Sequence, residues 1–180
     1  MLPVLFAIVI IAVLLFVIIA GRPDEFTVLR SGKISAPPEK VFPHVNELKK
    51  WDAWSPWAKI DPNCKIVFEG PASGNGASYT WSGNKKVGEG RMTITESRAS
   101  EFIQFKLEFL RPFKATNAAG FTFKSAGNQT EVTWSMTGKN NFFFKVFGLF
   151  MDCDTMVGKD FEKGLAGLKS VVESTAGAKS

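Results

Sequence analysis

Residues 64–138 alternate between apolar and polar side chains over six short segments, and this period of two constrains the fold more than any other feature of the chain. Successive side chains of a strand point to opposite faces, so the alternation predicts an antiparallel sheet with one covered face and one face in water. Turn-forming sequences such as GPASGNG and SAGNQ connect the segments. The predicted strands cover residues 64–69, 77–83, 91–97, 102–110, 120–125 and 131–138.

Helical patterns flank this region. The sequence FTVLRSGKI (26–34) predicts a first strand, and residues 35–48 predict a short helix whose apolar side chains recur at helical spacing. A long final helix is expected from about Phe147 to Ser174. Its apolar stripe contains Phe147, Phe150, Met151, Val157, Phe161, Leu165, Leu168 and Val172, and it is interrupted by Asp154 and Gly158.

Three of the five tryptophans lie within the sequence KKWDAWSPWAKIDP, residues 49–62. Trp51 and Trp54 share one face of a second short helix, because residues three apart are neighbours on a helix surface. Pro56 disfavours helical angles at Ser55, so the helix is expected to end there, with Trp57 beyond it. Side chains of this size are expected to be buried in the core, in a membrane or against a ligand.

The order of strand, two short helices, six strands and long helix resembles the SRPBCC superfamily, which includes START-like lipid-transfer domains and the birch-pollen allergen. The local match is to its bacterial polyketide-cyclase-like branch, and it covers roughly residues 26–172. It rests on APPEKVFPHVNEL, WDAWSPWAKIDP, GPASGNGASYTWSGNKKVGEGRMTI and VGKDFEKGLAGLK. The resemblance implies an α+β helix-grip fold, in which a curved antiparallel sheet wraps around the C-terminal helix and two short helices plug one end. In this fold an apolar cavity often lies between the sheet and the helix.

Residues 2–20 contain no charged or hydrogen-bonding side chain. As a helix this run spans roughly 28 Å, close to the ~30 Å hydrocarbon core of a bilayer. It exceeds the usual apolar length of a secretory signal peptide and no Lys or Arg precedes it, so an uncleaved anchor is favoured, with a cleaved signal as the alternative. The expected domains are an anchor (1–21), a linker (22–25), a helix-grip domain (26–175) and a tail (176–180).

Positive charges follow the apolar run rather than precede it: Arg22, Arg30, Lys33 and Lys40. The positive-inside rule therefore favours a cytoplasmic domain, anchored in what is expected to be a bacterial inner membrane. Cys64 and Cys153 are too few for a disulfide scaffold, which fits a reducing compartment, and a single Cys64–Cys153 bridge is the alternative. Only the short linker of residues 22–25 separates the anchor from the domain, so the domain is expected to lie almost on the bilayer.

The net charge of +5 comes from scattered basic residues, not from the dense basic stripe of a nucleic-acid-binding protein. The single histidine, His44, and the spacing of the cysteines provide neither a metal site nor a catalytic triad. We therefore expect no metal, no cofactor and no nucleic-acid partner, and the sequence identifies no catalytic residue. The expected partners are the lipid bilayer, through residues 2–20, and a hydrophobic small molecule.

The inward side chains of the predicted sheet are strongly aromatic, and a cavity among them would favour flat or long apolar ligands. Asp154 is a carboxylate within an apolar stripe, and Gly158 lacks a side chain one turn later, so together they suggest a space with one polar group at its wall. The alternative is that Asp154 meets solvent or pairs with a sheet residue such as Arg91. The candidate cavity residues are Trp54, Trp57, Tyr79, Trp81, Phe105, Phe123, Trp134, Asp154 and Gly158.

Three functions remain open from the sequence. The first is membrane-tethered binding or transport of a hydrophobic molecule or lipid. The second is a cyclase- or dehydratase-like enzyme in which Asp154 and Tyr79 act as acid and base. The third is a protein-interaction module whose cavity is filled by its own side chains.

Overall fold

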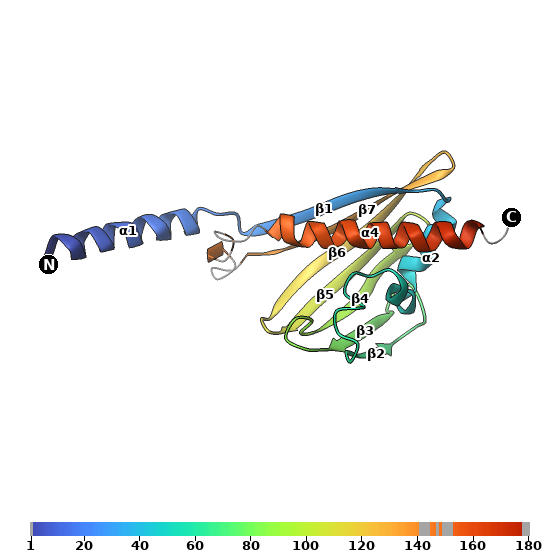
Figure 1. The fold of residues 1–180 in the computed structure, drawn as a ribbon, viewed down its shortest axis with the longest axis horizontal. Coiled ribbons are helices and arrows are strands. Elements are labelled where there is room, and N and C mark those ends of the chain that lie inside the picture. Colours follow the sequence, from blue (N-terminus) through green and yellow to red (C-terminus); the bar gives the residue numbers. More distant parts are fainter. Residues whose placement is uncertain (1, 141–144, 147, 149–152, 178–180) are drawn as a thin grey trace.

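The computed structural model describes residues 2–140, 145–146, 148 and 153–177. A seven-stranded antiparallel sheet curves around one long helix, α4, and the helix α1 projects from the opposite end to the C-terminus (Figure 1). This is the α+β helix-grip architecture predicted from the sequence. The elements are α1 (Leu2–Ala20), β1 (Glu25–Ile34), α2 (Pro38–Asn46), the 3-10 helix η1 (Leu48–Ala53), β2 (Lys65–Glu69), β3 (Ser78–Ser82), β4 (Glu89–Arg98), β5 (Phe102–Arg111), β6 (Ala115–Ala126), β7 (Gln129–Lys139) and α4 (Cys153–Gly177).

The strands β2 to β7 form a meander, and β1 then pairs with β7, giving the order β1-β7-β6-β5-β4-β3-β2. The register of β1 against β7 places Val28 opposite Met136 and Arg30 opposite Trp134. Since β1 follows directly on α1, this pairing fixes where the N-terminal helix leaves the domain.

One apolar core lies between the concave face of the sheet and α4. Alternate residues of β5, β6 and β7 are buried, as the period of two predicts, and Ile103, Phe121 and Val132 are fully covered. From α4 the stripe residues Phe161, Leu165, Leu168 and Val172 are buried. Phe147, Phe150 and Met151, which the sequence assigned to the same helix, lie outside the described residues.

The helices α2 and η1 close the end of this core that lies furthest from α1 (Figure 1). Val41 and Val45 of α2 are fully buried, and Trp51 and Trp54 are 6% and 4% exposed. The indole N–H of Trp51 donates to the Val45 carbonyl at 2.9 Å, and that of Trp54 donates to the His44 carbonyl at 3.0 Å. Both tryptophans therefore bury their rings without leaving a polar atom unpaired.

Strand β2 departs from the sequence prediction in its burial. The alternation over residues 64–69 predicts Cys64, Ile66 and Phe68 on the inward face, and all three do face η1. Every residue of β2 is nevertheless exposed, including Ile66 at 46% and Phe68 at 43%. β2 is an edge strand that pairs with β3 alone, and α4 packs mainly against β1 at the other side of the sheet. The alternation predicted the strand correctly but could not show how far the covering helix reaches.

Among the described residues, one helix is long and apolar enough to cross a membrane, over Pro3–Ala20. This criterion concerns length and composition, and a signal sequence near the N-terminus meets it as well. Apart from Ile19, whose side chain is buried, the described side chains of this helix are exposed.

Candidate functional site

The inward-facing side chains change in size along the sheet. On β6 they are Ala115, Asn117 and Ala119 near α1, followed by Phe121 and Phe123 toward α2. On β7, Gly138 lies opposite Asn117, whereas Trp134 lies opposite Phe121. The large side chains fill the end closed by α2 and η1, and the small ones leave space at the other end.

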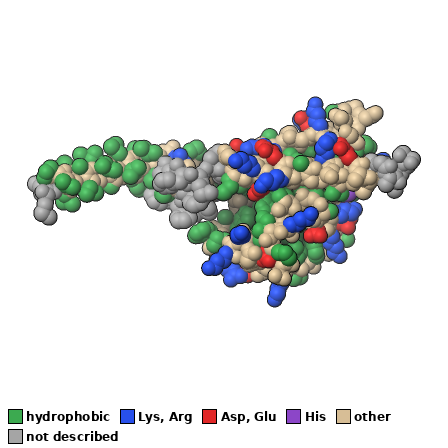
Figure 2. Space-filling model, viewed as in Figure 1, with side chains coloured by type: hydrophobic (Ala, Val, Ile, Leu, Met, Phe, Trp, Pro, Cys, Tyr) green, Lys and Arg blue, Asp and Glu red, His purple; other side chains and the backbone are tan. Residues whose placement is uncertain are grey.

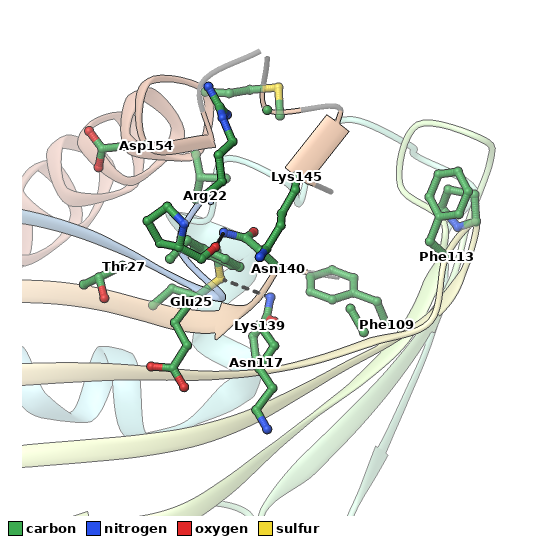
Figure 3. A pocket seen from close by; sticks show the side chains of 18 of the residues that line it. Arg22, Glu25, Thr27, Phe109, Phe113, Asn117, Lys139, Asn140, Lys145 and Asp154 are labelled. Carbon is green, nitrogen blue, oxygen red and sulfur yellow. Dashed lines mark hydrogen bonds between the residues drawn. The ribbon is translucent and has the colours of Figure 1, made fainter. Parts of the chain in front are cut away.

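A cavity of about 700 Å³ occupies that space. It opens below the start of α4, on the side from which α1 projects, where Figure 2 shows the surface hollowed. Its wall combines apolar side chains with polar ones at the rim (Figure 3). The principal apolar lining residues are Phe26, Phe109, Phe113, Ala115, Met136, Met156 and Val157, and the polar ones are Arg22, Glu25, Thr27, Arg111, Asn117, Lys139, Asn140, Lys145 and Asp154.

The segment joining α1 to β1 is part of this wall, since Arg22, Pro23 and Glu25 all line the cavity. It is held in place by side chains that follow β7. The ammonium of Lys145 forms an ion pair with Asp24 at 2.5 Å and donates to the carbonyl of Ala20 at 3.5 Å. Because of Lys145, the pKa of the Asp24 carboxyl is lowered.

The cavity rim carries four cationic side chains: Arg22, Arg111, Lys139 and Lys145. Arg111 is paired with Glu89 across β4 and β5, and the pKa of Glu89 is lowered by its hydrogen bonds with Ser82 and Arg111. In the described part of the chain, Arg22 and Lys139 have no carboxylate within 4 Å. Lys139 follows the inward position of Gly138 on β7, and its ammonium points away from the cavity (Figure 3). Among the described residues, Arg22 is therefore the cation available beside the cavity to a polar or anionic headgroup.

Asp154 lies at this rim, but its carboxylate points away from the cavity (Figure 3). Both of its oxygens accept hydrogen bonds from the guanidinium of Arg30, at 2.9 and 3.0 Å. Arg30 also donates to Glu162 at 2.9 Å, and these two carboxylates raise the pKa of Arg30 further above its ordinary value. Asp154 thus pairs with a sheet residue, as the alternative interpretation of the sequence predicted. The partner is Arg30, whereas Arg91, the example suggested by the sequence, pairs with Glu69.

The absence of a side chain at Gly158 leaves room for the guanidinium of Arg30 between β1 and α4. A Cβ atom at this position would overlap the guanidinium of Arg30. The space that the sequence suggested beside Asp154 is therefore occupied by an arginine side chain, and Gly158 itself is buried beneath it.

A second, smaller hollow of about 90 Å³ lies between η1 and the strands β2 and β3. Three of the candidate residues line it: Trp57, Tyr79 and Trp81. Trp57 is 37% exposed and its ring packs edge-on against Trp134 at 5.6 Å. Burial raises the pKa of the Tyr79 hydroxyl above its ordinary value, so this phenol stays protonated near neutral pH.

The other four candidates belong to the packed core rather than to either hollow. Trp54, Phe105, Phe123 and Trp134 are at most 5% exposed. Trp134 stacks on Phe161 of α4 with ring centroids 4.1 Å apart. The nine residues predicted for a single site are thus divided among the core, the small hollow and the ion pair at the cavity rim.

No group of three metal-ligating side chains occurs among the described residues. Burial lowers the pKa of His44, so its imidazole is mostly neutral at pH 7. It does not line either of the two hollows. Cys64 is a free thiol, and the side chain of Cys153 lies outside the described residues.

The residues that shape the large cavity were not identified from the sequence. Ala115 and Asn117 line the cavity, but nothing in their own sequence neighbourhood marks them as lining residues. The signal was present in β6, where inward positions change from Ala115, Asn117 and Ala119 to Phe121 and Phe123. Such a step in side-chain size along one face of a strand indicates which end of the groove stays open.

Comparison with known proteins supports the fold. The profile of the family described as "Polyketide cyclase / dehydrase and lipid transport" matches residues 25–173. No curated protein matches the chain.

Solved structures share the architecture at low sequence identity. A protein from Thermus thermophilus is 18% identical with a TM-score of 0.59, over 86% of this chain and 100% of that one. The Aha1 dimer from Colwellia psychrerythraea is 16% identical with a TM-score of 0.59, over 82% and 96%. Ara h 8.0201 is 14% identical with a TM-score of 0.57, over 83% and 99%. At these identities the likeness concerns the fold alone.

Proposed function

The chain belongs to the polyketide cyclase/dehydrase and lipid transport family, and we propose that it binds a hydrophobic or amphipathic small molecule in the cavity beside α1 while α1 tethers it to a membrane. In this proposal residues 1–21 are the anchor and 26–175 the binding domain. The ligand is a lipid or another apolar molecule taken from the adjoining bilayer.

The position of the cavity carries the proposal. Its volume of about 700 Å³ lies within the roughly 300–1,000 Å³ of typical ligand sites. It is walled by Arg22 and Pro23, the second and third residues after α1. An apolar molecule that leaves the bilayer beside α1 would therefore reach the cavity with little passage through water, whose contact with apolar surface is unfavourable.

The lining suggests how such a ligand would be oriented. Phe26, Phe109 and Met136 provide apolar contact in the interior, whereas Arg22 and Asn140 lie among the polar groups of the lining. An amphipathic molecule would bury its apolar part against the first set and leave its polar end near the second.

The enzymatic alternative has less support. Asp154 is engaged by Arg30 through two hydrogen bonds and lines the large cavity, whereas Tyr79 lines the small hollow. One ligand in either hollow would meet only one of the two groups. The pairing of Asp154 and Tyr79 as acid and base is therefore not favoured. The filled-cavity alternative is disfavoured by the size of the open space.

Membrane sidedness follows from charge. Arg22, Arg30, Lys33 and Lys40 come after α1, and by the positive-inside rule we assign the domain to the cytoplasmic side of a bacterial inner membrane. A cysteine placed at Asn128, in the exposed turn between β6 and β7, tests this in a background with serine at Cys64 and Cys153. In intact cells a membrane-impermeant maleimide should leave it unlabelled. Labelling there would place the domain outside.

The binding proposal is tested by extracting the full chain from its membrane with a styrene–maleic acid copolymer and identifying bound molecules by native mass spectrometry and organic extraction. The matched variants are Ala115→Trp, which fills the cavity, and Ala126→Trp at the exposed opposite end of β6. We expect a molecule bound at close to one per chain in the original protein and in Ala126→Trp, and at least a tenfold loss in Ala115→Trp.

Equal amounts of bound molecule in the two variants would contradict the proposal. So would an original chain that carries nothing and fails to bind apolar fluorophores, and that result would favour the interaction module. Circular dichroism of both variants shows whether the fold has been kept.

A further inference from the structure

We propose that the face around the cavity mouth docks on the surface of an anionic bilayer, with the turn between β5 and β6 as its contact. This rests on the proposed tether, since it supposes that α1 lies in the same bilayer. It adds a second membrane contact that orients the domain and places the cavity mouth against the lipid.

The linker between α1 and β1 is held at several points. Lys145 binds both Asp24 and the Ala20 carbonyl. Asn140, directly after β7, donates from its backbone N–H to the Asp24 carbonyl at 2.7 Å and from its side chain to the Pro23 carbonyl at 3.2 Å. These contacts bind the end of α1 to the end of β7. The linker is therefore held against this end of the domain, and with α1 in a bilayer this end would face the membrane.

The β5–β6 turn, residues 112–114, lies at this end. Figure 1 shows the β5–β6 hairpin tip on the side of the domain from which α1 projects, and the β6–β7 turn on the opposite side. Strand β6 connects the two turns and has 12 residues, so they are separated by roughly 40 Å at about 3.3 Å per residue. The two turns thus mark the near and far ends of the domain relative to the bilayer.

The near turn has the composition of a membrane-surface contact. Leu110 is 51% exposed, and Phe113, which also makes a contact within the protein, is still 52% exposed. Arg111 and Lys114 alternate with them and are exposed. Met156, at the start of α4 and in the cavity wall, is 45% exposed.

Large apolar side chains next to basic ones fit the interface of a bilayer, where the apolar groups enter the acyl boundary and the basic groups meet anionic headgroups. The β6–β7 turn, with Gly127 and Asn128 at its tip, has no large apolar side chain. This difference in composition matches the difference in distance from α1.

Docking would change how the cavity is reached. With the β5–β6 turn on one side and the linker after α1 on the other, lipid would cover the mouth between them. Phe109 and Phe113 lie on the turn side and Arg22 and Lys145 on the linker side of the cavity (Figure 3). The apolar interior would then open toward lipid rather than toward water.

The test uses spin labels on the full chain in nanodiscs of phosphatidylcholine with or without phosphatidylglycerol, in a background carrying serine at Cys64 and Cys153. Single cysteines replace Ile11 in the middle of α1, Leu110 at the near turn and Asn128 at the far turn. Oxygen, which concentrates in lipid, and a water-soluble nickel complex report the surroundings of each label. Leu110 is chosen because its side chain does not line the cavity, so protection there reports lipid rather than burial in the hollow.

We expect the ratio of oxygen to nickel accessibility at Leu110→Cys to exceed that at Asn128→Cys several-fold in discs with phosphatidylglycerol. The added change Lys114→Glu should lower that ratio, whereas Lys124→Glu, an exposed change near the far end of β6, should not. Circular dichroism confirms that each labelled chain is folded.

Equal ratios at the two turns, with Ile11→Cys in lipid, would overturn the docking proposal and leave the tether intact. A label at Ile11 that is exposed to the nickel complex would overturn the tether and with it the docking surface. The two failures are therefore distinguished by a single set of labels.

Discussion

The two ends of the groove between the sheet and α4 are built from the same strands, but one end is filled by aromatic side chains and the other holds an open cavity. At the end closed by α2 and η1, Trp51, Trp54, Phe121 and Trp134 pack with ring centroids 4.6–6.1 Å apart, within the spacing that aromatic pairs prefer. At the end beside α1, small side chains such as that of Ala115 border a cavity of about 700 Å³. Packing at the aromatic end therefore stabilises the domain, whereas the end beside α1 has room for a ligand.

The sharpest test of this division compares two phenylalanines on neighbouring strands. Phe121→Ala removes a fully buried ring and should lower the free energy of unfolding by about 3–5 kcal/mol, because a new cavity forms in the packed core. Phe109→Ala removes a half-buried ring that already borders the hollow. It should cost about 1 kcal/mol, since only part of the roughly 1.5–3 kcal/mol of a fully buried side chain is lost.

Chemical unfolding of both variants in detergent micelles, followed by tryptophan fluorescence, measures the two free energies. Equal losses would mean that the cavity end is packed as tightly as the other and would remove the distinction between the ends.

A second prediction concerns the ion pair that joins β1 to α4 near the cavity. Gly158→Ala should destabilise the domain by about 1 kcal/mol, because its Cβ would displace the guanidinium of Arg30 from its partly exposed ion pairs with Asp154 and Glu162. In an Arg30→Ala background the same change should instead stabilise by about 0.5–1 kcal/mol, the ordinary preference for Ala over Gly within a helix.

Thermal unfolding of the four proteins in this cycle measures the coupling. If the effect of Gly158→Ala keeps its sign when Arg30 is absent, the glycine does not serve to admit the arginine.

The acid sensitivity of the linker gives a smaller effect. Since Lys145 lowers the pKa of Asp24 below its ordinary value of 3.8, Asp24 contributes stability that is present above about pH 4 and is lost as the pH falls through the lowered pKa. The unfolding temperature of the original chain should therefore fall between about pH 5 and pH 3 by more than that of Asp24→Asn. Parallel curves for the two proteins would show that the Lys145 contact does not hold the linker in solution.

The sequence predicted the fold well because its signals are local. A period of two identified each strand from its own residues, and the spacing of Val41 and Val45 identified the buried face of α2. The exposure of Ile66 and Phe68 was not predicted, since it depends on how far α4 extends across the sheet.

The site was predicted less well because it depends on register between strands. A Cβ at Gly138 would overlap the amide of Asn117, which lines the cavity, and the two residues meet only because β6 and β7 place them opposite each other. Arg30 and Asp154 are separated by 124 residues, and nothing in either neighbourhood identifies the other. The aromatic candidates were correctly placed on inward positions, but the position of a side chain on a covered face does not say whether it borders a space or fills one.

The last prediction separates the two hollows, and its expected effect is the smallest. Trp57 lines the hollow of about 90 Å³ between η1 and β3, so Trp57→Phe should leave the amount of molecule bound to the full chain unchanged, whereas Ala115→Trp should reduce it at least tenfold. Native mass spectrometry of both variants after copolymer extraction provides the comparison. If Trp57→Phe depletes the bound molecule and Ala115→Trp does not, the ligand lies at the aromatic end after all. The cavity beside α1 would then need another explanation. Small inward residues at that end stabilise the domain less than the aromatic residues at the end closed by α2 and η1, and ligand binding would no longer account for them.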